Sequence, residues 1–212
     1  MGRRREHDEH TAAALLDAAE RTIAEEGVDA LSLREVASDA GTTTRAIYSL
    51  FGSKDGLLGA LGVRAFNVLQ RELEALPATD QPLNDLVEAA LIFRRFTLEH
   101  PALFSIAFHR ADPAISPRFR AARMDALAAL QMRFEPLADA DLLGGRSVAE
   151  AAMQFHALCE GAAWLELRGN PLTSDPERFW RNAFHALITG FAAPAPRRPQ
   201  RAGRRRGRTT VV

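Results

Sequence analysis

The stretch that decides the fold runs from Leu31 to Leu58 and reads LSLREVASDAGTTTRAIYSLFGSKDGLL. Ser32 is followed three residues later by Glu35, which is the spacing of a capping box. The Ser32 hydroxyl can accept a hydrogen bond from the Glu35 amide, and the Glu35 carboxylate can reach back toward residue 32. This pattern predicts that a helix begins at Ser32.

The residues after this start predict a turn and then a second helix. Ala37 is small enough for two helices to cross, Gly41 adopts a left-handed conformation at low cost, and Ile47 supplies a buried aliphatic. The second helix then presents short polar groups, a guanidinium and a phenol, on Thr43, Thr44, Arg45, Tyr48 and Ser49. Such a surface fits a major groove, where it can reach base edges and phosphates. The stretch therefore predicts a helix-turn-helix.

The rest of the chain also has helical periodicity. Apolar residues repeat at three- and four-residue spacing, and no alternating run indicates a strand. We therefore predict an all-α protein with about nine helices. The expected ranges are 8–26, 32–40, 43–50, 54–76, 83–99, 101–110, 117–135, 147–168 and 175–192.

Charge is distributed unevenly, although 27 basic and 27 acidic residues balance over the chain. The segments 3–5 and 197–208 hold ten of the 27 basic residues and none of the acidic ones. Residues 6–196 keep 17 basic and 27 acidic residues, a net charge of −10. We expect phosphate contacts to come from local features and not from a basic globule. The composition after Pro194 predicts a disordered tail.

Nothing in the sequence predicts secretion or membrane insertion. No apolar segment follows the basic start as in a signal peptide, and no stretch approaches the ~18 apolar residues of a membrane span. We expect a soluble, cytoplasmic protein. Cys159 is the only cysteine, so an intramolecular disulfide is excluded.

The stretch quoted above resembles the TetR/AcrR family of transcriptional regulators. The resemblance rests on the residues at 31–37, 40–41, 46–48 and 51–58, including the spacing Tyr48-x-x-Phe51-x-x-Lys54. It implies a homodimeric, sequence-specific DNA-binding regulator, most often a repressor that a small-molecule effector releases from its operator. The implied partners are a double-stranded DNA operator, an unidentified effector and a second copy of the chain, with no cofactor.

The resemblance also implies roles for individual residues. Ser32 would touch a phosphate, and Lys54 would bind one through its charge and the helix N-terminus. Thr42 departs from the family pattern, which has an aliphatic there. The implied DNA-binding residues are Ser32, Thr43, Thr44, Arg45, Tyr48, Ser49 and Lys54.

The family's domain plan divides the chain into three parts. We expect a helix-turn-helix domain at 1–56, an effector-binding and dimerisation domain at 57–193, and the Arg-rich tail at 194–212. Aromatic and Met side chains suit an adaptable apolar pocket, although ordinary core packing is the alternative. The candidate pocket residues are Phe66, Phe93, Phe96, Phe104, Phe108, Met124, Met153 and His156.

The last two expected helices are the candidates for dimerisation. Two such helices from each subunit would form a four-helix bundle about a two-fold axis, and the alternative is packing within one chain. The candidate interface residues are Phe155, Cys159, Ala162, Phe184, Leu187, Ile188 and Phe191.

Two other classes of protein compete with this interpretation. His156, Cys159 and Glu160 fall within about one helical turn, which allows a nucleophile, a metal site or a simple polar pair. A catalytic cysteine needs a positioned base and an oxyanion hole, and no motif indicates them. We therefore predict no catalytic residue, no metal ligand and no enzyme. The remaining alternative is a helical interaction protein whose helical hairpin is only structural.

Overall fold

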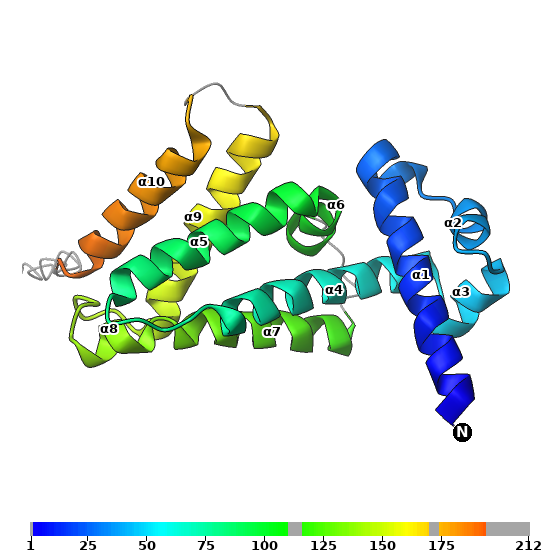
Figure 1. Cartoon of the computed structure of the whole chain (residues 1–212), viewed down its shortest axis with the longest axis horizontal. Coiled ribbons are helices and arrows are strands. Elements are labelled where there is room, and N and C mark those ends of the chain that lie inside the picture. Colours follow the sequence, from blue (N-terminus) through cyan, green and yellow to red (C-terminus); the bar gives the residue numbers. More distant parts are fainter. Residues whose placement is uncertain (1, 110–115, 170–173, 194–212) are drawn as a thin grey trace, which may run out of the picture.

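The computed structural model describes residues 2–109, 116–169 and 174–193, and Figure 1 shows them as an all-helical molecule with two units. These ranges hold ten α-helices, a short 3-10 turn at Val28–Ala30 and a π-helical turn at Ser105–His109. The all-α prediction is confirmed. The tail predicted at 194–212 lies outside the described residues. None of the described helices is long and apolar enough to cross a membrane.

Helices α1 (Gly2–Glu26), α2 (Leu33–Asp39) and α3 (Thr44–Phe51) form the smaller unit, at the right of Figure 1. Ser32 caps α2, and its hydroxyl accepts a hydrogen bond from the Glu35 amide. Gly41 has a φ of +64°, so the turn between α2 and α3 uses the left-handed conformation that glycine tolerates. Ile47 is fully buried in the core of this unit. The capping box, the turn and the buried aliphatic lie where the sequence places them.

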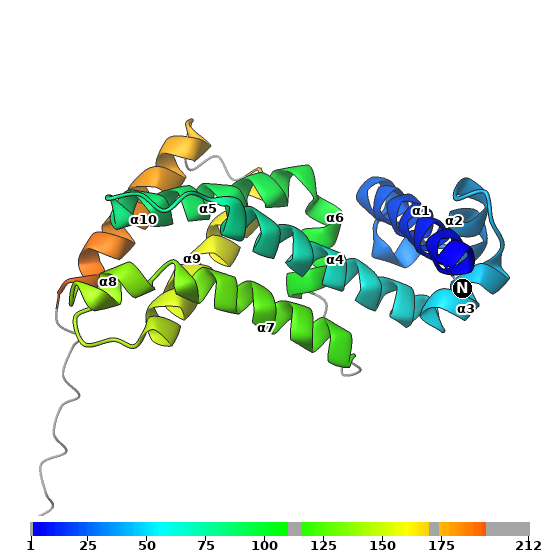
Figure 2. The ribbon, with the colours of Figure 1, turned by 60° about the horizontal axis from the view of Figure 1, so that its bottom comes forward.

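The larger unit is a helical bundle into which the long helix α4 runs from the smaller unit (Figures 1 and 2). Its helices are α4 (Lys54–Ala75), α5 (Pro82–Glu99), α6 (Pro101–Phe104), α7 (Pro117–Met132), α8 (Glu135–Asp139), α9 (Val148–Leu167) and α10 (Pro176–Phe191). Helices α4 and α7 approach closely at Gly62, where an added Cβ would lie 2.2 Å from the Phe119 ring. A larger residue at position 62 would therefore require the Phe119 ring to move.

Two of the expected helices are divided. The helix expected over 117–135 ends at Met132, and α8 follows it as a separate short helix. The helix expected over 101–110 contains only one α-helical turn before the π-helical turn begins at Ser105. A π turn adds a residue to the helical repeat and is frequent at functional sites. It changes the direction of the side chains that follow Phe104.

A polar network joins α5, α9 and α10. Glu166 on α9 accepts two hydrogen bonds from Arg94 Nε and Nη2 on α5, the shorter at 2.7 Å. The same carboxylate accepts a hydrogen bond from Trp180 Nε1 on α10 at 2.8 Å. Glu166 and Arg94 are mostly buried, and Trp180 is fully buried. The network fixes the relative positions of three helices around one carboxylate.

Candidate DNA-binding surface and effector pocket

Helix α3 has one buried and one exposed face. The Ile47 side chain, on one face of the helix, is buried. Arg45, Tyr48 and Ser49 are exposed, and 57% of Tyr48 is accessible to solvent. Thr43 is the N-cap residue, exposed and in extended conformation, and Thr44 is half-buried. The helix therefore presents a guanidinium, a phenol and hydroxyls to solvent at the end of the molecule, as a recognition helix requires.

Ser32 and Lys54 lie together at one corner of this unit. The Lys54 Nζ donates a hydrogen bond to the Leu31 carbonyl at 2.7 Å, next to the start of α2. An ammonium carries three N–H donors, so two of them stay available for a phosphate. Lys54 thus has a structural contact that the sequence analysis did not anticipate, because residues 31 and 54 are far apart along the chain.

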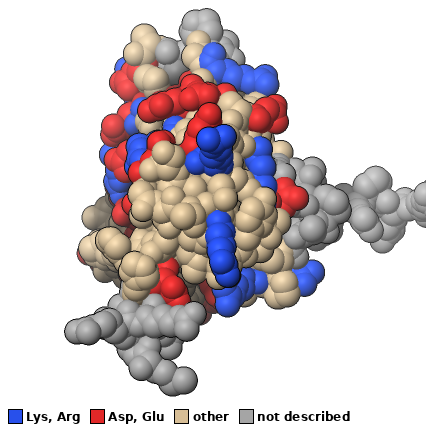
Figure 3. Space-filling model, turned by 90° about the vertical axis from the view of Figure 1, so that its right-hand side faces the viewer, with Lys and Arg blue, Asp and Glu red and all other residues tan. Residues whose placement is uncertain are grey.

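This end of the molecule is not strongly basic. Between residues 27 and 61 there are three basic and four acidic residues. Figure 3, which views this end, shows blue residues scattered over a mainly uncharged surface, with red residues gathered above them. Non-specific attraction to DNA therefore has little support from this segment, and binding depends on the fit of α3 and on local phosphate contacts.

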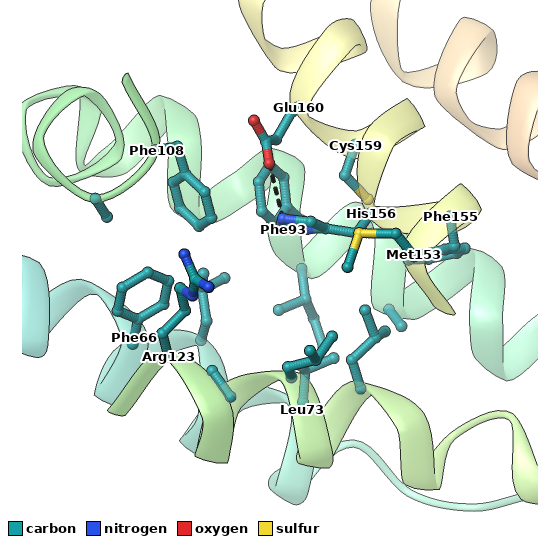
Figure 4. Close-up of a pocket in the computed structure, with 17 residues that line it drawn as sticks. Phe66, Leu73, Phe93, Phe108, Arg123, Met153, Phe155, His156, Cys159 and Glu160 are labelled. Carbon is teal, nitrogen blue, oxygen red and sulfur yellow. Dashed lines mark ion pairs between the residues drawn. The ribbon is translucent and has the colours of Figure 1, made fainter. Parts of the chain in front are cut away.

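A cavity of about 300 Å³ lies inside the larger unit, between α4, α5, α7, α9 and the π turn (Figure 4). Most of the surface that lines it is apolar. The lining residues are Phe66, Leu69, Leu73, Ala89, Ile92, Phe93, Ala107, Phe108, Arg123, Ala126, Leu127, Leu130, Met153, Phe155, His156, Cys159 and Glu160. They include Phe66, Phe93, Phe108, Met153 and His156 from the expected pocket set.

The other three candidate pocket residues are elsewhere, and their assignment to the pocket is corrected. Phe96 and Phe104 are buried in the core outside the cavity. Met124 lies on the outer face of α7 and is 55% exposed. Its neighbour Arg123 lines the cavity instead. Helical periodicity from Ala126, Leu127 and Leu130 could have indicated this, since residue 123 shares their face of α7.

The polar groups of the cavity come mainly from α9 and α7. His156 Nε2 lies 2.8 Å from Glu160 Oε1, one helical turn away, so the polar-pair interpretation of these residues is the one their geometry supports. The hydrogen bond from His156 lowers the pKa of Glu160, against the effect of partial burial. Burial raises the pKa of the Cys159 thiol, and the nearby Glu160 charge adds to the effect. A buried, protonated thiol does not act as a nucleophile.

Most residues expected at the dimer interface belong to the core of a single chain. The side chains of Phe155, Cys159, Ala162, Phe184, Ile188 and Phe191 are at most 4% exposed. These six leave almost no surface for a partner, so their assignment to an interface is corrected. Leu187 is half-buried against the same core. The apolar stripes of α9 and α10 are directed inward because they pack on their own bundle.

The two units meet through a group of charged side chains. Glu20 on α1 contacts His100, which precedes α6, through Oε1 and Nδ1 at 2.8 Å. The other oxygen of Glu20 accepts a hydrogen bond from Arg64 on α4 at 3.2 Å, and Arg64 also pairs with Asp17. The helix-turn-helix unit is thus held to both α4 and the start of α6 by one carboxylate.

A helix-turn-helix joined by a long helix to a bundle with its own apolar cavity defines the class of DNA-binding regulators with a separate ligand domain. Two family models match the chain: residues 15–61 match "Bacterial regulatory proteins, tetR family", and residues 86–187 match "Tetracyclin repressor-like, C-terminal domain". The chain belongs to the TetR family of DNA-binding transcriptional regulators, which is not a family of enzymes.

Similar proteins agree with this assignment. The HTH-type transcriptional regulator Rv1816 of Mycobacterium tuberculosis is 26% identical over 142 residues, which span 61% of each chain. A Rhodococcus sp. RHA1 protein with unknown function has a TM-score of 0.77 at 24% identity, covering 86% of this chain and 95% of that one. The regulator FadR from Bacillus subtilis, solved in complex with stearoyl-CoA, has a TM-score of 0.71 at 15% identity, covering 84% and 98%. The two structural matches show the fold alone.

Proposed function

We propose that the protein is a transcriptional repressor that binds a palindromic operator as a homodimer and is released by a small molecule in the α4–α9 cavity. The observation that carries this proposal is the combination of an exposed polar helix, α3, at one end with an apolar cavity in the other unit. A regulator needs both a surface for DNA and a separate site for its signal. Such a protein acts in the cytoplasm, where it meets the chromosome.

The contacts between the units supply a route from cavity to DNA. Ala107 and Phe108 of the π turn line the cavity, and this turn directly follows α6. Helix α6 begins next to His100, which contacts Glu20 on α1. A ligand that displaces Phe108 would move α6 and so change the position of α1 relative to α4. Release follows only if the ligand binds the displaced conformer more tightly than the DNA-bound one.

Exposed residues of α9 and α10 are the better candidates for the dimer interface. Leu165 and Leu167 near the end of α9 and Phe179 near the start of α10 are 37–42% exposed. Ala157 and Gly161 are exposed on α9 and are small enough for a second helix to approach. These residues fit the outer faces of two helices that pair with their copies in a four-helix bundle.

The test is operator binding by the purified full chain. We expect a dimer in light scattering and a retarded complex with the gene's own promoter fragment that survives excess unrelated DNA. Footprinting should show two protected half-sites with dyad symmetry about one helical turn, or a multiple of it, apart. A complex that unrelated DNA removes equally well would contradict the proposal. Screening small molecules for loss of the retarded complex then tests effector control.

A further inference from the structure

We propose that the cavity takes a monocarboxylate with an apolar chain, and that Arg123 binds the carboxylate at the cavity mouth. This inference rests on the proposed function, because it assigns a chemical class to the effector of that site.

The size of the cavity limits the ligand. With about 30 Å³ for each water-sized group, a volume of 300 Å³ holds about ten non-hydrogen atoms, so a ten-carbon chain fills it when the head group lies at the mouth. The deep lining is aliphatic and well buried, with Leu69, Leu73, Ile92 and Leu130 all at most 7% exposed. No polar group among the lining residues on α4 and α5 reaches this end. An unbranched or aromatic hydrocarbon of moderate length is therefore the part of a ligand that fits here.

The polar groups belong to the more exposed part of the lining. Arg123 is exposed, and Glu160 and His156 are partly exposed. Figure 4 shows the Arg123 side chain between the rings of Phe66 and Phe108, with its guanidinium directed into the lined space. The cavity is therefore apolar in its depth and charged at its mouth, which is the layout for an amphipathic ligand.

The charges at the mouth favour an anion. Glu160 already accepts the contact from His156 at 2.8 Å, so this carboxylate has a partner. Across the described ranges, no carboxylate lies within ion-pairing distance of Arg123, whereas Arg64, Arg94, Arg95 and Arg181 all have one. A guanidinium offers paired N–H donors that match a carboxylate. A cationic head would face an uncompensated positive charge.

The experiment compares three ten-carbon ligands that differ only in the head group. Decanoate, decanol and decylammonium are titrated calorimetrically into the full chain, below their micelle concentrations. We expect decanoate to bind about tenfold or more tightly than decanol, since a charged hydrogen bond contributes that much, and decylammonium to bind most weakly. In R123Q, decanoate should bind no more tightly than decanol, while decanol affinity stays unchanged.

The matched control is R120Q, one turn away on the exposed side of α7 and outside the cavity lining. It should bind all three ligands as the unmodified chain does. Tighter binding of decanol or decylammonium than of decanoate, or equal decanoate binding by R123Q, would overturn the carboxylate assignment. If none of the three binds, the inference also fails. The proposed function is judged separately, by operator binding and by release from a wider set of compounds.

Discussion

Arg45 and Tyr48 are the side chains of α3 best placed to reach DNA, because both are exposed while the opposite side of the helix is buried. Replacing either with Ala should weaken operator binding by roughly 1–3 kcal/mol, since each substitution removes a base or phosphate contact. Fluorescence anisotropy with a labelled operator measures the change. R120A, on α7, is the control and should bind normally. Undiminished operator affinity in both Ala variants would rule out α3 as the recognition helix.

Lys54 combines a structural and a proposed electrostatic role. Its hydrogen bond to the Leu31 carbonyl links the starts of α2 and α4. K54Q should lower the free energy of unfolding by about 1 kcal/mol through loss of this bond. If Lys54 also binds a phosphate, the slope of log K against log salt should become shallower by about one unit. Urea denaturation and a salt series separate the two effects, and an unaltered slope would leave Lys54 a structural residue only.

At the scale of helices, Glu166 holds α5, α9 and α10 together. E166A removes the acceptor for both Arg94 and Trp180, whose indole N–H is then buried without a partner. We expect the free energy of unfolding to fall by roughly 1.5–3 kcal/mol, as for hydrogen bonds to a charged group. E72A breaks the exposed Arg95–Glu72 pair and should cost at most about 1 kcal/mol. If E166A and E72A lowered the free energy of unfolding equally, the buried network would stabilise the fold no more than an exposed ion pair.

The contacts of Glu20 couple the helix-turn-helix unit to the bundle. E20Q keeps the size of the side chain but weakens its contacts with His100 and Arg64. We expect operator affinity to change by about 5-fold or more, with folding retained, because this carboxylate sets the position of α1 against α4 and α6. E99Q, an exposed change next to His100, is the control. Operator affinity within twofold of the unmodified chain would exclude Glu20 as a coupling residue.

For the whole molecule, the proposed dimer uses the outward faces of α9 and α10. L165E places a charge on the exposed apolar part of α9, where a partner helix would bury it. Light scattering should show monomers at micromolar concentration, and operator affinity should fall because only one half-site is held per molecule. L98E, on α5, introduces the same charge at an equally exposed leucine and should remain dimeric. A dimeric L165E would move the interface elsewhere.

Charge over the whole chain has a second consequence. The segment 27–61 contributes a net charge of −1, so it does not itself attract the phosphate backbone. Specific contacts must therefore supply much of the operator affinity.

The sequence by itself determined the helix-turn-helix and the all-helical class. Ser32 acts through a capping hydrogen bond to a residue three positions away, and Gly41 acts through a positive φ in the turn. Local interactions of this kind are visible in a short stretch of chain, since no distant residue is needed to satisfy them.

The tertiary structure alone decided the cavity and the orientation of the last two helices. An apolar period shows that a face is buried but not what buries it, so Phe155 and Phe184 could equally well have met a partner. The π turn after Phe104 directs Phe108 into the cavity and leaves Phe104 in the core. No pattern in the local sequence predicts this turn. Arg123 became a candidate ligand residue only because three other helices and the π turn pack around the space it borders. Packing between distant segments sets these features. The hydrophobic effect is non-directional, so it does not by itself specify which segment buries a given apolar face.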